Sequence, residues 1–284
     1  MTPIKNIPPR VHVLLARDTP LAAVIRRGPA KVACVVAWDR STDTFTLGNW
    51  VKARLYEDQS DISPDGKYLL YTANNGLYQE GAVAQWSAIS KVPSLKPLLY
   101  WQEKGAASAG GLFTGDRTYW LNDARHPMSV KPESFVRDHS FDTSRLIHGK
   151  RTSVYAIKLG LNGWTKIATP AGINTASTSF EKKLPGGWRL IKHVNDDPDP
   201  QENIFGEAHT FANDVHAIHQ HRPLWEWADW DRHRLVWTER GKLWAANLGE
   251  KGLTDAKILK DFDEYKFDPD LVVVSPLSPK PERR

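Results

Sequence analysis

The chain has 284 residues, of which 40% are hydrophobic and 25% charged, a composition typical of a globular protein with a sizeable core. No apolar run is long enough to span a membrane, and the N-terminus lacks a convincing signal peptide, so we expect a cytoplasmic protein. The single cysteine, Cys34, excludes an internal disulfide framework and any cysteine-based zinc site. The net charge of +5 comes from scattered basic residues, unlike the concentrated charge of a nucleic-acid-binding protein.

Short alternating apolar runs, bounded by Gly, Asp, Asn and Pro, predict an all-β protein with little helix. One good strand, Arg10–Ala16, has no obvious partner near the N-terminus. Further along, two strands flank a turn at Asp39–Asp43. A turn followed by an alternating strand then recurs along the chain. The second strands of the resulting units are predicted at 31–38, 67–73, 117–122, 145–149, 188–194 and 234–239.

An internal repeat supports this division into units. The segments Arg145–Thr165 and Arg234–Thr254 match without gaps, and each is interpreted as a strand, a tight turn, a second strand and a glycine-containing turn. Six units of roughly 40–50 residues have the period of propeller blades. In the last unit we expect four strands, at 224–231, 233–240, 241–248 and 255–265. The third unit is crowded and must have a missing strand or very short ones.

The segment DISPDGKYLLYTA, from Asp61 to Ala73, resembles the WD40-like repeat of TolB-type β-propellers. In that family the S-P-D-G-K sequence forms the turn between the inner and second strands of a blade. The resemblance is confined mainly to these residues, and it implies a fold more than a function.

The predicted fold is therefore a single-domain, six-bladed β-propeller over residues 10–275, with five or seven blades as alternatives. Residues 1–9 and 276–284 are expected to form flexible tails. Because a closed ring removes free sheet edges, Arg10–Ala16 is expected to complete the last blade beside residues 256–264. Tryptophans are expected to fill the space between blades. Those in predicted strands are Trp38, Trp120, Trp188, Trp237 and Trp244.

The segment between His193 and His221 is rich in acids and histidines. Its carboxylates are of the type that Ca²⁺ prefers, and the spacing of His216, His219 and His221 could suit Zn²⁺. An exposed outer strand explains the histidines equally well, since His219 and His221 would share one face of a strand. We therefore expect no cofactor and assign no metal ligand, with a divalent metal such as Ca or Zn as the alternative.

No nucleophile motif or phosphate-binding loop is present, and Cys34 lies in an apolar strand, so no catalytic residue is assigned. The loops from second to third strands open on one face of a propeller, where binding residues concentrate. The binding candidates on this face are Asp123, Arg125, His126, Lys150, Asp196 and Asp197. Arg125 is the preferred anchor, whereas Arg151 and Arg240 occupy equivalent repeat positions and are expected to brace their turns.

Two functions remain open from the sequence. The first is a non-catalytic binding module that presents this polar face to a protein partner. The alternative is a metal-assisted hydrolase of small molecules, of lactonase or glycosidase type, with its site on the same face. Neither nucleic acid nor a membrane is expected as a partner, and the protein is expected to be a monomer.

Overall fold

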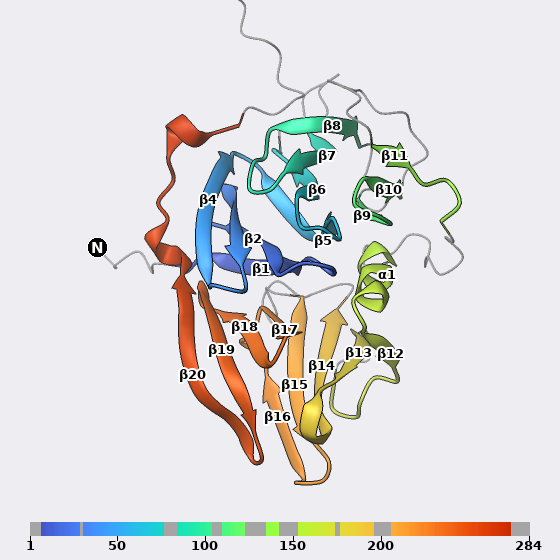
Figure 1. Ribbon diagram of the computed structural model, residues 1–284, viewed down its shortest axis with the longest axis vertical. Helices are drawn as coiled ribbons and strands as arrows, with labels where there is room; N and C mark the ends of the chain where they lie inside the picture. The colour runs from blue at the N-terminus through green and yellow to red at the C-terminus, as the bar shows by residue number, and fades with distance from the viewer. Residues whose placement is uncertain are drawn as a thin grey trace, which may run out of the picture. The chain divides into compact units, whose positions relative to one another are not determined.

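The computed structural model describes residues 7–28, 31–76, 84–103, 110–122, 135–141, 153–173, 177–195 and 206–273. Over these ranges the protein is mostly β, with five sheets (Figure 1). They contain no helix long and apolar enough to cross a membrane. The chain divides into two compact units. The N-terminal unit consists of Val13–Val154 and the residues from Lys266 onward, and the C-terminal unit consists of the residues up to His12 and Tyr155–Tyr265.

Three sheets belong to the N-terminal unit, except that Arg10–His12, at the start of the first strand, belong to the C-terminal unit. The first contains β1 (Arg10–Leu15), β2 (Leu21–Arg27), β3 (Ala33–Asp39) and β4 (Thr44–Val51), in that order. The second contains β5 (Arg54–Ile62), β6 (Tyr68–Asn74), β7 (Gln85–Lys91) and β8 (Pro97–Gln102), also in chain order. The third has short strands, β9 (Gly111–Phe113), β10 (Thr118–Leu121) and β11 (Val136–Arg137). A short 3-10 helix, η4 (Pro269–Leu271), follows near the end of the described chain.

The C-terminal unit contains α1 (Ser153–Leu161), which begins at the boundary between the units, and two sheets. The five-stranded sheet contains β12 (Thr165–Ile167), β13 (Ser177–Lys183), β14 (Trp188–Asn195), β15 (Glu207–Asn213) and β16 (Ile218–Arg222). The four-stranded sheet contains β17 (Trp227–Asp231), β18 (Arg234–Glu239), β19 (Lys242–Gly249) and β20 (Gly252–Asp261). Two 3-10 helices, η2 (Pro185–Gly187) and η3 (Phe262–Glu264), follow β13 and β20.

The turn between β5 and β6 has the form that the S-P-D-G-K sequence predicts. The hydroxyl of Ser63 lies 2.6 Å from Asp65 Oδ1 and also accepts the backbone N–H of Tyr68. Asp65 Oδ1 accepts the N–H of Lys67, and Gly66 has a φ of +76°, which a residue without a side chain adopts readily. Local side-chain hydrogen bonds therefore fix this turn, which is why a short sequence pattern identifies it.

The last sheet confirms the four strands predicted for the last unit, with the expected turns between them. The third unit is also as expected, because its strands are short. One feature of it was not predicted: β11 pairs with β10 in parallel, whereas β9 pairs with β10 antiparallel.

The two copies of the internal repeat have different structures. Residues 242–249 form β19, but the residues that match them 89 positions earlier form α1, so the predicted strand there is wrong. The buried residues of the helix, Val154, Tyr155, Lys158 and Leu159, recur at helical spacing. The helix ends where Gly163 takes a φ of +80° and the N–H of Trp164 bonds the carbonyl of Leu159. The first strand of this copy, 145–149, lies outside the described residues.

The prediction for the N-terminal strand is also wrong. Residues 10–15 form β1, which pairs with β2 in the first sheet, while β20 is an edge strand whose neighbour is β19. The partner of β1 is β2, formed by residues 21–27, for which the sequence pattern predicts no strand. With β1 and β2 in place, the predicted second strand at 31–38 becomes the third strand, β3.

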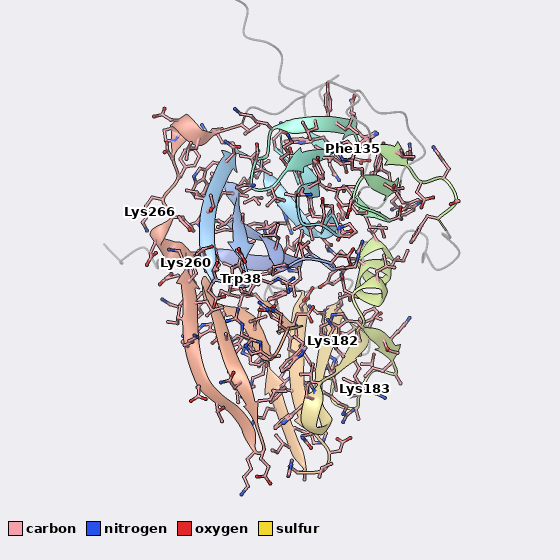
Figure 2. All side chains as sticks on the ribbon, viewed as in Figure 1. Trp38, Phe135, Lys182, Lys183, Lys260 and Lys266 are labelled. Atoms are coloured by element: carbon pink, nitrogen blue, oxygen red, sulfur yellow. The ribbon has the colours of Figure 1, made fainter. Side chains whose placement is uncertain are left out.

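Each unit has its own apolar core. In the N-terminal unit, Ile25 and Val35 of the first sheet share a cluster with Leu55 and Leu69 of the second. In the C-terminal unit, a second cluster includes Leu159 of α1 and aromatic residues of both sheets. The five tryptophans expected in strands all lie in strands, and Trp38, labelled in Figure 2, is fully buried. Trp120, Trp188 and Trp237 are buried as well and Trp244 is partly buried, and Trp188 stacks on Phe211 of the neighbouring strand at 4.2 Å between ring centroids.

Candidate functional site

The six binding residues predicted from the sequence cannot be placed in the structure. Asp123, Arg125, His126, Lys150, Asp196 and Asp197 all lie outside the described residues. Arg151 lies outside them as well. Arg240 is described, and its backbone has a φ of +49° in the turn between β18 and β19. Its side chain is exposed and makes no hydrogen bond or ion pair with any described residue, which does not fit the predicted bracing role.

Within the histidine-rich segment, the described residues from 207 onward form the hairpin of β15 and β16. His219 and His221 are both exposed on the edge strand β16, as the outer-strand interpretation predicts. His216 lies in the connecting turn, and His219 Nε2 lies 3.5 Å from Asp214. Within the described part of the chain, no three His, Cys, Asp or Glu side chains are grouped so that they could hold a metal ion.

A buried ionic cluster lies on the inner face of the five-stranded sheet. Lys192 on β14 is 1% exposed, and its ammonium group donates to Glu207 Oε2 at 2.8 Å and to the Tyr155 hydroxyl at 3.1 Å. The ammonium also lies 5.7 Å from the ring centroid of Tyr155 and 5.4 Å from that of Trp164. Lys192 is therefore paired, hydrogen-bonded and flanked by aromatic rings, as a buried charge must be.

His209 lies beside this cluster and is fully buried. Its Nδ1 lies 3.1 Å from the carbonyl of Trp225, an arrangement that places the proton on Nδ1. Its Nε2 has no hydrogen-bond partner in the described chain and lies 3.9 Å from Glu207 Oε2. Burial, and secondarily the charge of Lys192, holds the pKa of His209 well below its usual range, so the ring is neutral at physiological pH.

His193 lies on the opposite face of the same sheet, since it follows Lys192 in β14. Its two ring nitrogens each lie 2.9 Å from a hydroxyl, Nδ1 from Ser179 and Nε2 from Thr210. Burial, with a smaller contribution from His221, lowers the pKa of His193 to about 4. A neutral ring held between two hydroxyls fits a structural role.

A second, partly buried ion pair connects the two sheets of the C-terminal unit. Lys182 of β13, labelled in Figure 2, pairs with Asp229 of β17, and its ammonium lies 5.0 Å from the ring centroid of Trp164. The indole N–H of Trp164 donates to the other oxygen of the same carboxylate at 3.3 Å. In the N-terminal unit, Cys34 is buried, and burial raises its pKa to about 12, so its thiol is protonated and inert.

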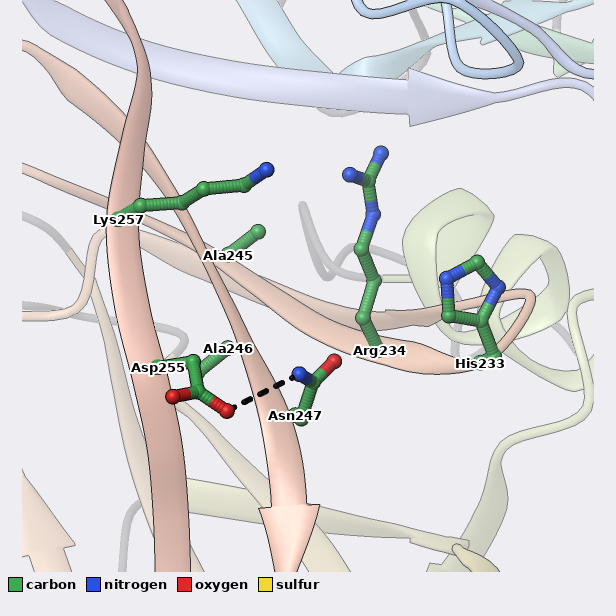
Figure 3. A pocket seen from close by; sticks show the side chains of 7 residues that line it. All are labelled: His233, Arg234, Ala245, Ala246, Asn247, Asp255 and Lys257. Carbon is green, nitrogen blue, oxygen red and sulfur yellow. Dashed lines mark hydrogen bonds between the residues drawn. The ribbon is translucent and has the colours of Figure 1, made fainter.

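An open depression with a volume of about 170 Å³ lies on the last sheet (Figure 3). Seven residues from the turn before β18 and from strands β18, β19 and β20 line it. They are His233, Arg234, Ala245, Ala246, Asn247, Asp255 and Lys257. Figure 3 shows the side chains of Arg234 and Lys257 on either side of Ala245. Asn247 and Asp255 close the other end, joined by a hydrogen bond of 3.4 Å.

The two cationic side chains of this depression, Arg234 and Lys257, differ in their partners. Arg234 donates to the buried carboxylate of Asp231 at 3.2 and 3.1 Å, so its charge is compensated within the protein. Lys257 is exposed and has no hydrogen-bond or ion-pair partner among the described residues. The depression therefore has one cationic side chain, Lys257, and one acidic side chain, Asp255, that form no ion pair with another described residue. Sequence reasoning missed it because its residues come from three strands and an irregular register brings Lys257 opposite Ala245.

No protein-family model matches the chain, and no curated protein matches it. Among solved structures, an uncharacterized protein from Listeria monocytogenes EGD-e aligns with 9% identity and a TM-score of 0.26, over 90% of this chain and 67% of that one. A prolyl endopeptidase aligns with 8% identity and a TM-score of 0.29, over 89% and 36% of the two chains. An acylaminoacyl peptidase from Pyrococcus horikoshii aligns with 11% identity and a TM-score of 0.26, over 90% and 53%.

This chain thus spans about a third of the aligned endopeptidase chain and about half of the acylaminoacyl peptidase chain. Alignments with TM-scores this low establish no shared fold, and neither the fold nor the function of this chain follows from them.

Proposed function

We propose that this chain is a non-catalytic binding module of the β-propeller type, with six blades, that presents polar loops to a protein partner. The observation that carries the proposal is the form of three sheets: β1–β4, β5–β8 and β17–β20 are each four antiparallel strands in chain order. A propeller blade has this form. The S-P-D-G-K turn, which resembles that of TolB-type repeats, supports the same interpretation.

The ionisable groups inside the sheets support a scaffold rather than a catalytic centre. Lys192 is held by Glu207 and Tyr155, and Lys182 by Asp229. Such buried and partly buried pairs hold their own side chains in place and leave contacts with other molecules to the loops. The loop residues proposed to contact the partner are those chosen from the sequence, Asp123, Arg125, His126, Lys150, Asp196 and Asp197. Arg125 is the proposed anchor, because Arg is enriched among residues that dominate binding energy.

The test compares Arg125→Ala with Lys251→Ala, a control in the exposed turn between β19 and β20. Tagged wild-type protein and both variants are used to capture partners from the native cell, and their melting temperatures are measured. We expect unchanged melting temperatures and a loss of about tenfold in capture for Arg125→Ala alone, as for an anchor residue. Equal capture by all three proteins contradicts the assignment of Arg125. A stoichiometric divalent metal in the purified protein, together with lactone or glycoside hydrolysis, would instead favour the alternative hydrolase.

A further inference from the structure

A segment from the far end of the described chain covers one end of the edge strand β4. In the first sheet, β4 pairs with β3 on one side, and the backbone groups of an edge strand are available for pairing on the other. Trp50 of β4 forms a parallel bridge with Val272, and its carbonyl accepts the N–H of Val273 at 2.7 Å. Residues 266–273, red beside β4 in Figure 1, are called the strap, and they belong to the same compact unit as β4.

Side chains at both ends of the strap also contact this unit. Phe267 meets the ring of Trp50 edge-on, with 5.6 Å between ring centroids, and the ammonium of Lys52 lies 5.8 Å from the centroid of the same phenyl ring. Val273 packs against the apolar core of the unit. The strap is therefore bound in the way that a peptide binds when it is added to the edge of a sheet, through main-chain pairing together with an aromatic and an aliphatic side chain.

Between these two contacts, the strap bonds mainly to itself. Pro269–Leu271 form the 3-10 helix η4, and the carboxylate of Asp268 accepts the N–H of Asp270 at 2.9 Å. The side chains of Phe267 and Leu271 are 40% and 38% exposed. A segment that is paired at one bridge and leaves large apolar side chains in water opens at a small cost compared with unfolding of the sheet below it.

The strap also leaves one polar group at this site unsatisfied. Trp50 is fully buried, and its indole N–H has no acceptor among the described residues. When the strap opens, the main chain at the end of β4 is exposed, and such an edge pairs readily with another extended chain. We propose that this end of β4 binds an extended segment of the protein partner, which displaces the strap. By the chemistry of the strap, that segment has an aromatic residue followed five or six positions later by aliphatic residues, as Phe267 is followed by Val272 and Val273.

This inference rests on the proposed function, since it gives the protein partner a second contact besides the loops. The strap then acts as an inhibitor in cis, because a tethered segment competes at an effective concentration of about millimolar. A substitution that weakens the strap should therefore make the site more accessible to a peptide added in solution.

The test measures fluorescence anisotropy of a labelled peptide with the sequence of residues 266–273, added to the full-length protein. The opening variant is Phe267→Ala, and the matched control is Leu271→Ala, which shortens another exposed side chain of the strap. We expect the peptide to bind Phe267→Ala about fivefold more tightly than wild type, because the competing strap has lost its aromatic contact. Leu271→Ala should bind as wild type, and a peptide with alanine in place of its phenylalanine should bind Phe267→Ala about fivefold more weakly than the parent peptide.

Hydrogen exchange locates the bound peptide. On saturation with the peptide, the amides of residues 266–273 in the full-length protein should exchange faster, because the strap is released, while those of β4 remain protected. Unchanged exchange in the strap overturns the inference, because the peptide would then bind elsewhere. Melting temperatures check that both variants are folded.

Three further outcomes also contradict the inference. The parent peptide binds neither the wild type nor Phe267→Ala, or it binds Phe267→Ala and Leu271→Ala equally well. In the third, the protein without peptide forms dimers as its concentration rises and Phe267→Ala abolishes them, so that the occupant is the strap of a second copy. If the peptide fails to bind but partner capture still depends on Arg125, this inference fails and the proposed function stands.

Discussion

Lys192 and Glu207 form an ion pair of 2.8 Å inside the C-terminal unit, where Lys192 is 1% exposed. Each charge depends on the other, because neither has enough water around it to be stable alone. Replacing Glu207 with Gln removes the counter-charge and leaves the ammonium buried. We expect a loss of about 3–5 kcal/mol in the free energy of unfolding, measured by urea denaturation.

The matched control is the double variant Lys192→Met, Glu207→Leu. It removes both charges and replaces them with apolar groups of similar length, so it should be more stable than Glu207→Gln. If Glu207→Gln costs no more than a typical surface substitution, Lys192 is less dependent on this carboxylate than its contacts indicate.

A second prediction concerns pH. His193 and His209 both have lowered pKa values in the folded protein, about 4 for His193, whereas an unfolded histidine has a pKa of about 6.5. Below pH 6.5 the unfolded chain therefore binds protons that the folded chain does not. The stability from these groups is fully present above this value and is lost as the pH falls toward 4. The free energy of unfolding should fall by up to about 1.4 kcal/mol per pH unit for each histidine.

The measurement is urea denaturation at several pH values between 7.5 and 4.5. His193→Gln preserves a side chain that can bond Ser179 and Thr210. It should reduce the slope of the free energy of unfolding against pH by the contribution of one histidine. His219→Gln, on the exposed strand β16, should leave the profile unchanged. If the free energy of unfolding of His193→Gln depends on pH as steeply as that of the wild type, His193 does not contribute to the pH dependence of stability.

The parts of the fold that the sequence predicts are those fixed by local chemistry. The turn at Ser63–Lys67 and the four strands of the last sheet follow from turn residues and alternation, which act over a few positions. The helix α1 could not be separated from a strand in this way. In the segment from Val154 to Leu161, apolar residues alternate as well as recur at helical spacing, and the packing of Tyr155 and Leu159 into the core decides the outcome.

The candidate sites were less predictable for a different reason. The depression needs Arg234, Ala245 and Lys257 on one face of three strands, and the register between β19 and β20 contains two irregularities that no sequence pattern indicates. The contacts of His209 depend equally on tertiary structure, since Trp225 and Glu207 approach it from different parts of the chain. Of these features, the sequence predicts only that His219 and His221 lie on the same face of an exposed strand, because alternation alone determines this.

A third prediction separates backbone strain from steric overlap in glycine turns. Gly66 and Gly163 both have a left-handed φ, +76° and +80°. A Cβ at Gly66 would lie 2.6 Å from the Cβ of Leu21, whereas a Cβ at Gly163 would have no atom within 4 Å. Gly163→Ala should cost about 1 kcal/mol, the strain of a left-handed residue. Gly66→Ala should cost clearly more, measured by urea denaturation, and equal costs would exclude the predicted overlap with Leu21.

The last prediction concerns the N-terminal strand. The N–H of Val11 in β1 donates to Glu226 Oε2 at 2.8 Å, and its carbonyl accepts the hydroxyl of Thr238 at 2.7 Å. Both groups of Val11 thus depend on side chains near the start of the last sheet. Glu226→Leu leaves the buried N–H without this acceptor and should cost about 1–3 kcal/mol, whereas Glu226→Gln retains an acceptor and should cost less.

Deleting residues 1–17 removes β1 altogether and exposes the edge of β2, whose central residues are buried. An unprotected apolar edge strand promotes pairing between molecules, so the shortened protein should melt at a lower temperature and aggregate. Deleting only residues 1–6 is the control, since it leaves β1 and the contacts of Val11 intact. The measurements are thermal melting and light scattering. If the longer deletion melts at the wild-type temperature and remains monomeric, β1 does not stabilise the protein and its place in the first sheet must be reconsidered.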